Sequence, residues 1–163
     1  MARMKTVTGM VVVLCLLGCS TNKRWSDQMR KDFEVNCLKT EVINNLTVSF
    51  RGFGEKDLST VTVKEYNGKK LINTFAITVE PFRGPWEKEN KVRYATLKRA
   101  ISIKHVYQFR IPGQRPRRLA DMKMVLWPQY TMYSEGWGCV MGAYTLDGVP
   151  FIKDTMPTFV KKP

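Results

Sequence analysis

The chain has 163 residues, of which 27 are basic and 14 acidic, so its formal net charge is +13 at pH 7. This length fits one domain and excludes an assembly of several large ones. The sequence has a single histidine and four cysteines. These are too few ligands for a typical zinc site if some of the cysteines are removed, lipidated or bonded to each other, as argued below. The positive charge indicates either an anionic partner or a surface that keeps the protein soluble.

The first residues have the layout of a secretory signal peptide. Arg3 and Lys5 precede an apolar run of 11 residues, Val7 to Leu17, and the small residue Gly18 follows. The run is shorter than the roughly 20 residues that a membrane-spanning helix needs. The sequence therefore predicts that residues 1–18 form a signal peptide.

The run Leu16-Leu17-Gly18-Cys19 resembles the lipobox of bacterial lipoprotein precursors. The resemblance implies cleavage before Cys19 and acylation of its sulfur and of the new amino terminus. Each buried methylene contributes about 0.8 kcal/mol, so two or three acyl chains anchor a protein stably. In that family an aspartate after the cysteine favours the inner membrane, and Ser20 here implies the outer membrane, facing the periplasm. The alternative is an ordinary secretory leader that leaves Cys19 as a thiol.

Residues 19–40 follow as the lipidated cysteine and a polar tether. Met29, Phe33 and Cys37 recur at a spacing of four, which places them on one face of a helix. The sequence therefore predicts a short helix over Asp27–Leu38 within this segment.

Two cysteines remain after Cys15 leaves with the leader and Cys19 takes up lipid. In an oxidising compartment the expected pairing is Cys37 with Cys139. The bridge would close a loop of about 100 residues, worth up to about 4.7 kcal/mol in the chain-entropy model. The alternative is two separate buried thiols. Neither cysteine belongs to a C-x-x-C pair, so the sequence does not indicate redox catalysis.

The rest of the chain, residues 41–163, alternates apolar and polar side chains with the period of β-strands. In the first half we expect a charged, exposed loop at residues 81–98. Three strands are expected before this loop: Leu46–Arg51, Val61–Tyr66 and Leu71–Val79. Asn67-Gly68 is the expected hairpin turn between the second and the third.

In the second half, Ala100–Ile111 is expected to be the longest strand. The sequence places a bend at residues 136–138 and a hairpin turn at Asp147-Gly148. Seven or eight strands at this spacing predict an all-β fold, an antiparallel β-sandwich of immunoglobulin-like or transthyretin-like type. The other strands expected here are Met122–Leu126, stopped by Pro128, then Cys139–Leu146 and Val149–Ile152, with residues 130–133 as a broken edge.

Three arginines lie close together between two apolar runs, at Arg115, Arg117 and Arg118. Guanidinium groups bind phosphate and carboxylate through a planar fork of donors, and arginine and tryptophan are frequent at interfaces. We therefore take this loop and Trp86 as the candidate contact surface. The alternative is a solvated turn.

Catalytic patterns are not visible in the sequence. The one histidine, His105, lies on the apolar face of its expected strand, as a core histidine with a satisfied hydrogen bond would. There is no G-x-S-x-G and no H-E-x-x-H motif, and Glu87 and Glu89 fit a solvated loop. We expect no cofactor, no metal site and no enzymatic activity.

The sequence thus predicts a membrane-anchored envelope lipoprotein that acts as a binding or adapter module. Its partners would be the bilayer, reached through acylated Cys19, and an acidic envelope protein or an anionic glycan or lipid. The predicted location outside the cytoplasm argues against nucleic acid, the usual partner of a basic domain. One alternative is an inhibitor or immunity protein that acts against a secreted enzyme or toxin. Another is a carboxylate-based hydrolase, which would need a pocket that holds His105 and two carboxylates.

Overall fold

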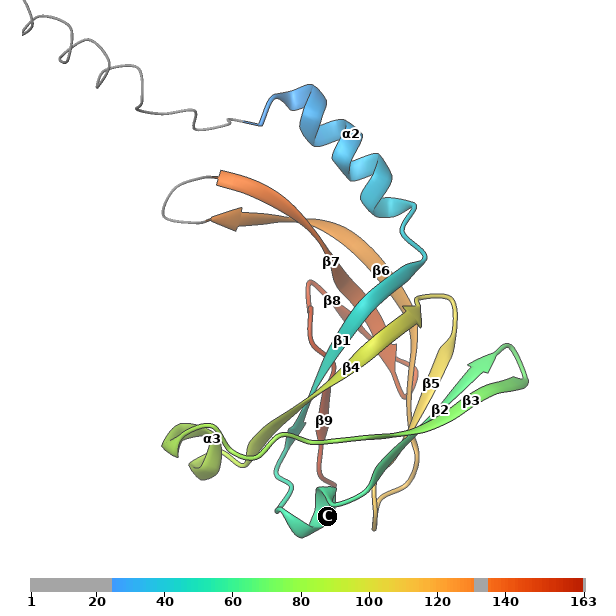
Figure 1. The fold of residues 1–163 in the computed structure, drawn as a ribbon, viewed down its shortest axis with the longest axis vertical. Coiled ribbons are helices and arrows are strands. Elements are labelled where there is room, and N and C mark those ends of the chain that lie inside the picture. The colour runs from blue at the N-terminus through green and yellow to red at the C-terminus, as the bar shows by residue number, and fades with distance from the viewer. Residues whose placement is uncertain (1–24, 131–134, 163) are drawn as a thin grey trace, which may run out of the picture.

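The computed structural model describes residues 25–130 and 135–162. The predicted signal peptide, the lipobox and Cys19 lie outside the described residues, as do residues 131–133 of the expected broken edge. The described ranges contain two α-helices, one short 3-10 helix and nine strands (Figure 1). The elements are α2 (Asp27–Leu38), β1 (Val42–Arg51), η1 (Lys56–Leu58), β2 (Val61–Asn67), β3 (Lys70–Ile77), α3 (Pro85–Glu89), β4 (Val92–Ser102), β5 (Val106–Arg110), β6 (Arg117–Tyr130), β7 (Glu135–Leu146), β8 (Val149–Ile152) and β9 (Thr158–Val160).

The strands form two sheets, one with the order β4-β1-β9 and the other with the order β3-β2-β5-β6-β7-β8. The predicted all-β sandwich is confirmed, with nine described strands where seven or eight were expected. Neighbouring strands are antiparallel, except that β9 runs parallel to β1. Both sheets are amphipathic, and their apolar faces meet in one core.

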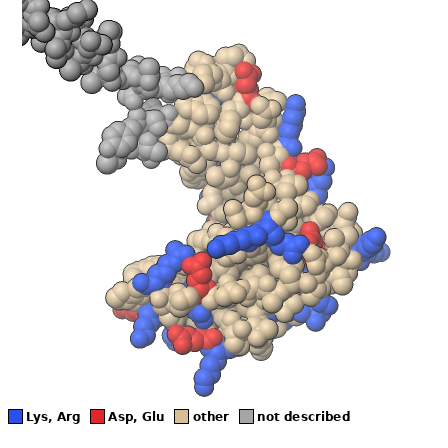
Figure 2. All heavy atoms as spheres, in the orientation of Figure 1, with Lys and Arg blue, Asp and Glu red and all other residues tan. Residues whose placement is uncertain are grey.

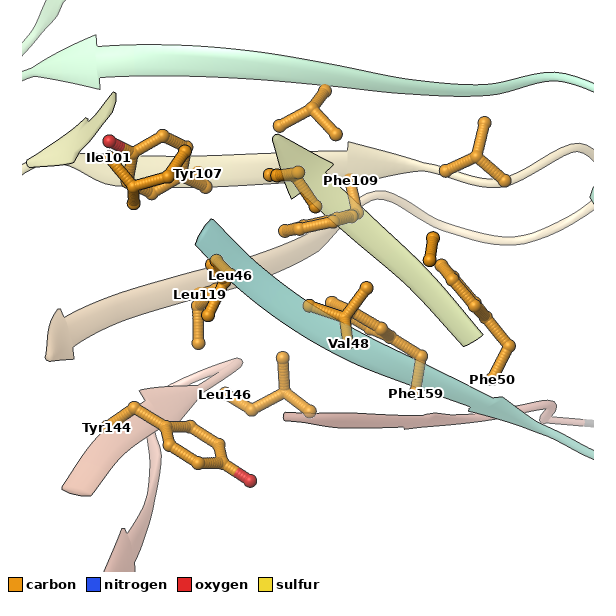
Figure 3. Packing of buried hydrophobic residues seen from close by; sticks show 14 of the residues in the cluster. Leu46, Val48, Phe50, Ile101, Tyr107, Phe109, Leu119, Tyr144, Leu146 and Phe159 are labelled. Atoms are coloured by element: carbon orange, nitrogen blue, oxygen red, sulfur yellow. The ribbon is translucent and has the colours of Figure 1, made fainter. Parts of the chain in front are cut away.

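Aromatic side chains dominate one end of this core. The ring of Phe159 lies 5.4 Å from that of Phe50 and 4.5 Å from that of Phe109, and all three are fully buried. Figure 3 shows these and other apolar side chains pointing into the layer between the strands. Burying each such side chain contributes about 1.5–3 kcal/mol. The three residues of β9 are therefore enough to fasten the small sheet to the large one through Phe159.

The helix α2 begins and ends where the sequence predicted. The Ser26 hydroxyl caps it by accepting a hydrogen bond from the Met29 amide at 3.2 Å. At its other end, Cys37 is buried and bonded to Cys139 of β7, with the two Cα atoms 5.4 Å apart. The predicted disulfide is therefore confirmed, and it fastens the helix against β6 and β7 (Figure 1).

The expected exposed loop at residues 81–98 is wrong in its second half. Only residues 81–91, which include α3, connect strands, and β4 occupies the remainder. The positions of β4 that face the core are Arg93, Ala95 and Leu97. An arginine and an alanine do not stand out from their neighbours in hydrophobicity, so the strand period was hidden.

The expected long strand Ala100–Ile111 is also wrong. The chain leaves β4 after Ser102, turns over residues 103–105 and enters β5 at Val106. β4 and β5 belong to different sheets, yet Ile101, Tyr107 and Phe109 are all buried. Because both sheets face the same core, the apolar alternation continues while the strand does not.

Two stops in the second half were placed wrongly. β6 runs through Pro128, and the expected bend at residues 136–138 is part of β7, where Trp137 pairs with Pro128. β5 pairs with β6 only over residues 117–119, so in the described sheet Pro128 has a strand partner on one side. A proline is tolerated at such a sheet edge where its nitrogen faces away from the partner strand.

Of the two predicted hairpin turns, one lies at the expected residues and the other is displaced by one residue. At Asp147-Gly148 both residues have positive φ, 55° and 82°, as the predicted type I′ turn requires. The first turn lies one residue later than expected, at residues 68 and 69, with Gly68 at φ 57°. A register shift between Glu65 and Tyr66 moves the pairing along by that residue.

Candidate binding groove between two sheet edges

β3 is an edge strand of the six-stranded sheet, and β4 is an edge strand of the three-stranded sheet. β3 pairs with β2 and β4 pairs with β1, and in the described chain neither has a strand on its other side. Their free edges run antiparallel to each other. Glu80 lies beside Tyr94 at one end, and Phe75 lies beside Arg99 at the other. Two rows of unpaired backbone groups therefore face one another across the gap between the sheets.

Hydrogen bonds hold the two edges together at one end. The Glu80 amide donates to the Tyr94 carbonyl at 2.7 Å. Arg93, which is 8% exposed, donates from Nε to the Glu80 carbonyl at 2.8 Å and from Nη2 to the Val79 carbonyl at 3.2 Å. α3 and Trp86 lie on the chain that connects the strands just beyond this closed end.

Between this closed end and Arg99, the two edges line a groove of about 570 Å³. Its base is apolar, because Phe75 and Ile77 are only partly covered and Leu97 is buried beside them. Its rim is polar. The lining residues are Phe75, Ala76, Ile77, Thr78, Glu80, Thr96, Leu97, Lys98 and Arg99.

The groove carries positive charge. Lys98 and Arg99 both line it, and Glu80, the acidic residue of the lining, is already paired with Arg83. Figure 2 shows that the Lys and Arg side chains on the face in view lie mainly over the lower half of the molecule. An anion that enters the groove would therefore meet more positive than negative charge.

Two arginines at this site each have a buried nitrogen without a hydrogen-bond partner among the described residues, Arg93 at Nη1 and Arg99 at Nε. Arg93 donates to two carbonyls through its other nitrogens, so Arg99 is the less satisfied of the two. Its guanidinium lies 4.1 Å above the Phe75 ring, and its Nε is buried with no hydrogen-bond partner among the described residues. A buried donor without a partner costs about 1–3 kcal/mol. The fold therefore holds a guanidinium at the groove with donors to spare.

The predicted arginine cluster does not form one surface. Arg117 is 7% exposed, and its Nε donates to Asp147 while its Nη1 donates to the Val160 carbonyl at 3.1 Å. Arg115 and Arg118 remain at the surface. The expectation of three presented guanidinium groups is corrected, because alternation along β6 turns Arg117 toward the core.

The tryptophan of the candidate surface, Trp86, differs from Trp137 in its surroundings. Trp86 on α3 is 61% exposed and remains available for contact. Trp137 lies beneath the Arg30 guanidinium at 4.3 Å, in the packing between α2 and β7.

His105 has the satisfied hydrogen bond that the sequence suggested, although it lies in the turn between β4 and β5. Its Nδ1 is 2.8 Å from Glu65 Oε1, and the Tyr107 hydroxyl donates to the same oxygen at 3.1 Å. Burial raises the pKa of Tyr107 above its ordinary value, the Glu65 carboxylate raises it further, and nearby Arg99 opposes both. The cluster brings one carboxylate to His105, and Glu87 and Glu89 lie elsewhere, on α3.

Other kinds of site find little support in the described ranges. No three His, Cys, Asp or Glu side chains there are placed to share a metal ion. None of the helices in the same ranges is both long enough and apolar enough to cross a bilayer. Comparison with known proteins finds no family model, no curated protein and no solved structure that matches the chain.

The groove could not be found from the sequence. It needs the free edges of β3 and β4 to face each other, and the sequence predicted a loop over residues 81–98, which contain most of β4. The adjacent charges of Lys98 and Arg99 were visible, but the ring of Phe75 beneath Arg99 was not.

Proposed function

We propose that this chain is a non-catalytic binding module of the cell envelope that holds an acidic segment of a partner protein between β3 and β4. The observation that carries the proposal is Arg99, a guanidinium in the groove that has no counter-charge among the described residues. Carboxylates accept paired hydrogen bonds from such a group, with roughly twice the strength of neutral ones. The apolar base formed by Phe75 and Ile77 favours a protein segment over a wholly polar glycan.

The anchor belongs to the same proposal. The lipobox-like run that ends at Cys19 supports attachment to the outer membrane, facing the periplasm. A tethered module needs no membrane-binding surface of its own and leaves its groove free for a partner. The single carboxylate at His105 does not favour the hydrolase alternative.

Binding of an acidic chain tests the function. Purified protein should bind labelled polyglutamate at low ionic strength, and raised salt should weaken the complex. The double variant Lys98→Gln/Arg99→Gln should bind at least tenfold more weakly. The control Arg118→Gln/Lys123→Gln removes the same charge from exposed positions of β6 and should bind normally. Equal loss in both variants would reduce the interaction to net charge and contradict the proposed site. Preference for anionic glycan or anionic vesicles over polyglutamate would contradict the partner class.

Replacement of Cys19 tests the anchor separately. Cys19→Ser should move the protein from the membrane fraction to the soluble fraction, because the acylated sulfur is lost. Cys15→Ser, four residues earlier in the predicted leader, should leave fractionation unchanged. Retention of the Cys19→Ser protein in washed membranes would contradict the lipid anchor.

A further inference from the structure

The groove offers more than charge, because both of its walls are unpaired strand edges. We infer that it binds its partner by strand addition, as an extended segment in which apolar and acidic residues alternate. The inference rests on the proposed function and specifies the conformation and the sequence pattern of the partner.

The backbone provides the first part of the argument. β3 and β4 each pair on one side only, so alternate amides and carbonyls along each strand point toward the groove. A backbone hydrogen bond between Glu80 and Tyr94 and the side chain of Arg93 close one end of the groove. The edges at residues 75–78 and 96–99 have no described strand between them. An extended peptide satisfies such groups through a regular ladder, which is the mode of β-strand addition.

The side chains provide the second part. In β3, Phe75 and Ile77 are partly buried and pack against the core, while Ala76 and Thr78, the residue after the strand, are exposed. A strand laid beside them presents alternate residues to the same two sides. One set would cover Phe75 and Ile77, which favours apolar residues. The other set would lie at the rim beside Lys98, which favours acidic ones, since opposite charges on neighbouring strands attract.

Arg99 defines the open end of the site. Its ring contact with Phe75 holds the guanidinium plane in place, so little freedom is lost when a carboxylate binds. The hydrogen bonds of Arg93 prevent a strand from continuing past the other end. The partner segment therefore pairs over roughly four residues of the β3 edge. Arg99 lies on the same face as Phe75, so the carboxylate that it binds is the one at the carboxyl terminus of the segment, and the acidic side chains lie on the other face, beside Lys98.

A second copy of this chain is a poorer occupant. Two of the four groove residues on β4, Lys98 and Arg99, are basic, and like charges placed opposite each other destabilise strand pairs. The charge balance of the rim thus favours an acidic partner over self-association.

Synthetic hexapeptides test the inference on the purified full chain. The first probe alternates valine and glutamate. The second alternates valine and lysine, and the third has the first composition with valines and glutamates in separate blocks. Two further probes are the alternating acidic peptide N-methylated either at every valine or at every glutamate. N-methylation removes the backbone donors of one strand edge and leaves all charges in place.

We expect the alternating acidic peptide to bind at least tenfold more tightly than the lysine and block peptides. At least one N-methylated peptide should lose about tenfold, since it forfeits ladder hydrogen bonds. Arg99→Gln should weaken the acidic peptide about tenfold, and Arg118→Gln should not. Hydrogen exchange should slow on binding at residues 75–78 and 96–99. Unchanged Arg99→Gln stability in denaturant would show that the lost binding does not come from unfolding.

The outcomes separate the two proposals. If polyglutamate binds through Lys98 and Arg99 but both N-methylated peptides bind like their parent, strand addition is overturned and the proposed function stands. If neither polyglutamate nor any peptide binds, both fail. Concentration-dependent dimers that slow exchange at the same residues without peptide would assign the groove to self-association and overturn the inference.

Discussion

Several arginines of this protein lie over aromatic rings, and two of them, Arg117 and Arg99, have different surroundings. Arg117 lies over Phe159 at 5.9 Å, and Arg99 lies over Phe75 at 4.1 Å. Arg117 pairs with Asp147 and donates to a backbone carbonyl. Arg99 makes no ion pair with any described residue, and its buried Nε has no acceptor.

The difference separates a structural arginine from a binding one. Arg117 connects β6 to the β7–β8 turn and to β9, so its donors are used within the fold. Arg99 receives an aromatic platform but no acceptor, although burial makes an unused donor costly. A guanidinium that the fold positions and does not satisfy is best explained by a ligand that supplies the acceptor.

The rings beneath the two arginines should differ most in their effect on stability. Phe159→Ala should lower the free energy of unfolding by about 3–5 kcal/mol, because it opens a cavity among fully buried rings. Phe75→Ala should lower it by only about 1 kcal/mol, since Phe75 is partly covered. Chemical denaturation of both variants measures the gap. Equal losses would mean that the groove is packed as tightly as the core.

The arginines themselves should follow the same order. Arg117→Met should cost about 2–3 kcal/mol, because it leaves Asp147 without its partner. This value lies below that for a fully buried pair, since the Asp147 side chain is 19% exposed. An Asp147→Asn variant should recover part of the loss in the Arg117→Met background. A loss below about 1 kcal/mol would show that the ion pair does not serve the fold.

Two buried tyrosines predict loss of stability at alkaline pH. Burial raises the pKa of both Tyr107 and Tyr144 above the ordinary value of 10.0, and hydrogen-bonded carboxylates raise it further. Above pH 10 the unfolded chain releases these protons and the native chain keeps them, so stability falls as the pH rises. The loss should reach about 1 kcal/mol per tyrosine at pH 11.

Denaturation between pH 8 and 11 tests this, with Tyr144→Phe and Tyr107→Phe each removing one share of the slope. In the Arg99→Met variant, Tyr107 should ionise at still higher pH, because Arg99 lowers its pKa. A pH-independent stability in this range would contradict the assigned burial of the two hydroxyls.

The smallest effect on stability is expected at Arg99. Arg99→Met keeps an apolar chain over Phe75 and removes the unsatisfied Nε, so the free energy of unfolding should change by less than about 1 kcal/mol. Its peptide binding should fall nonetheless. A destabilisation as large as that of Arg117→Met would make Arg99 structural and remove the contrast between the two sites.

The sequence by itself determined the local features of this protein. The helix Asp27–Leu38, the positive-φ turn at Asp147-Gly148 and the alternation of β1 and β2 each depend on residues close together in the chain. The Cys37–Cys139 bridge followed from counting, since two cysteines allow one pairing. Such features are set by backbone preferences and side-chain period, which a sequence displays directly.

Only the tertiary structure decided which strands meet. The crossing from β4 to β5 is hidden because both sheets share one core, so the apolar period continues across the turn at residues 103–105. The same information separates Arg117 from Arg99, since one receives Asp147 from 30 residues away and the other receives none. Partners brought by long-range pairing leave no periodic trace in the chain, and the groove between β3 and β4 exists only through that pairing.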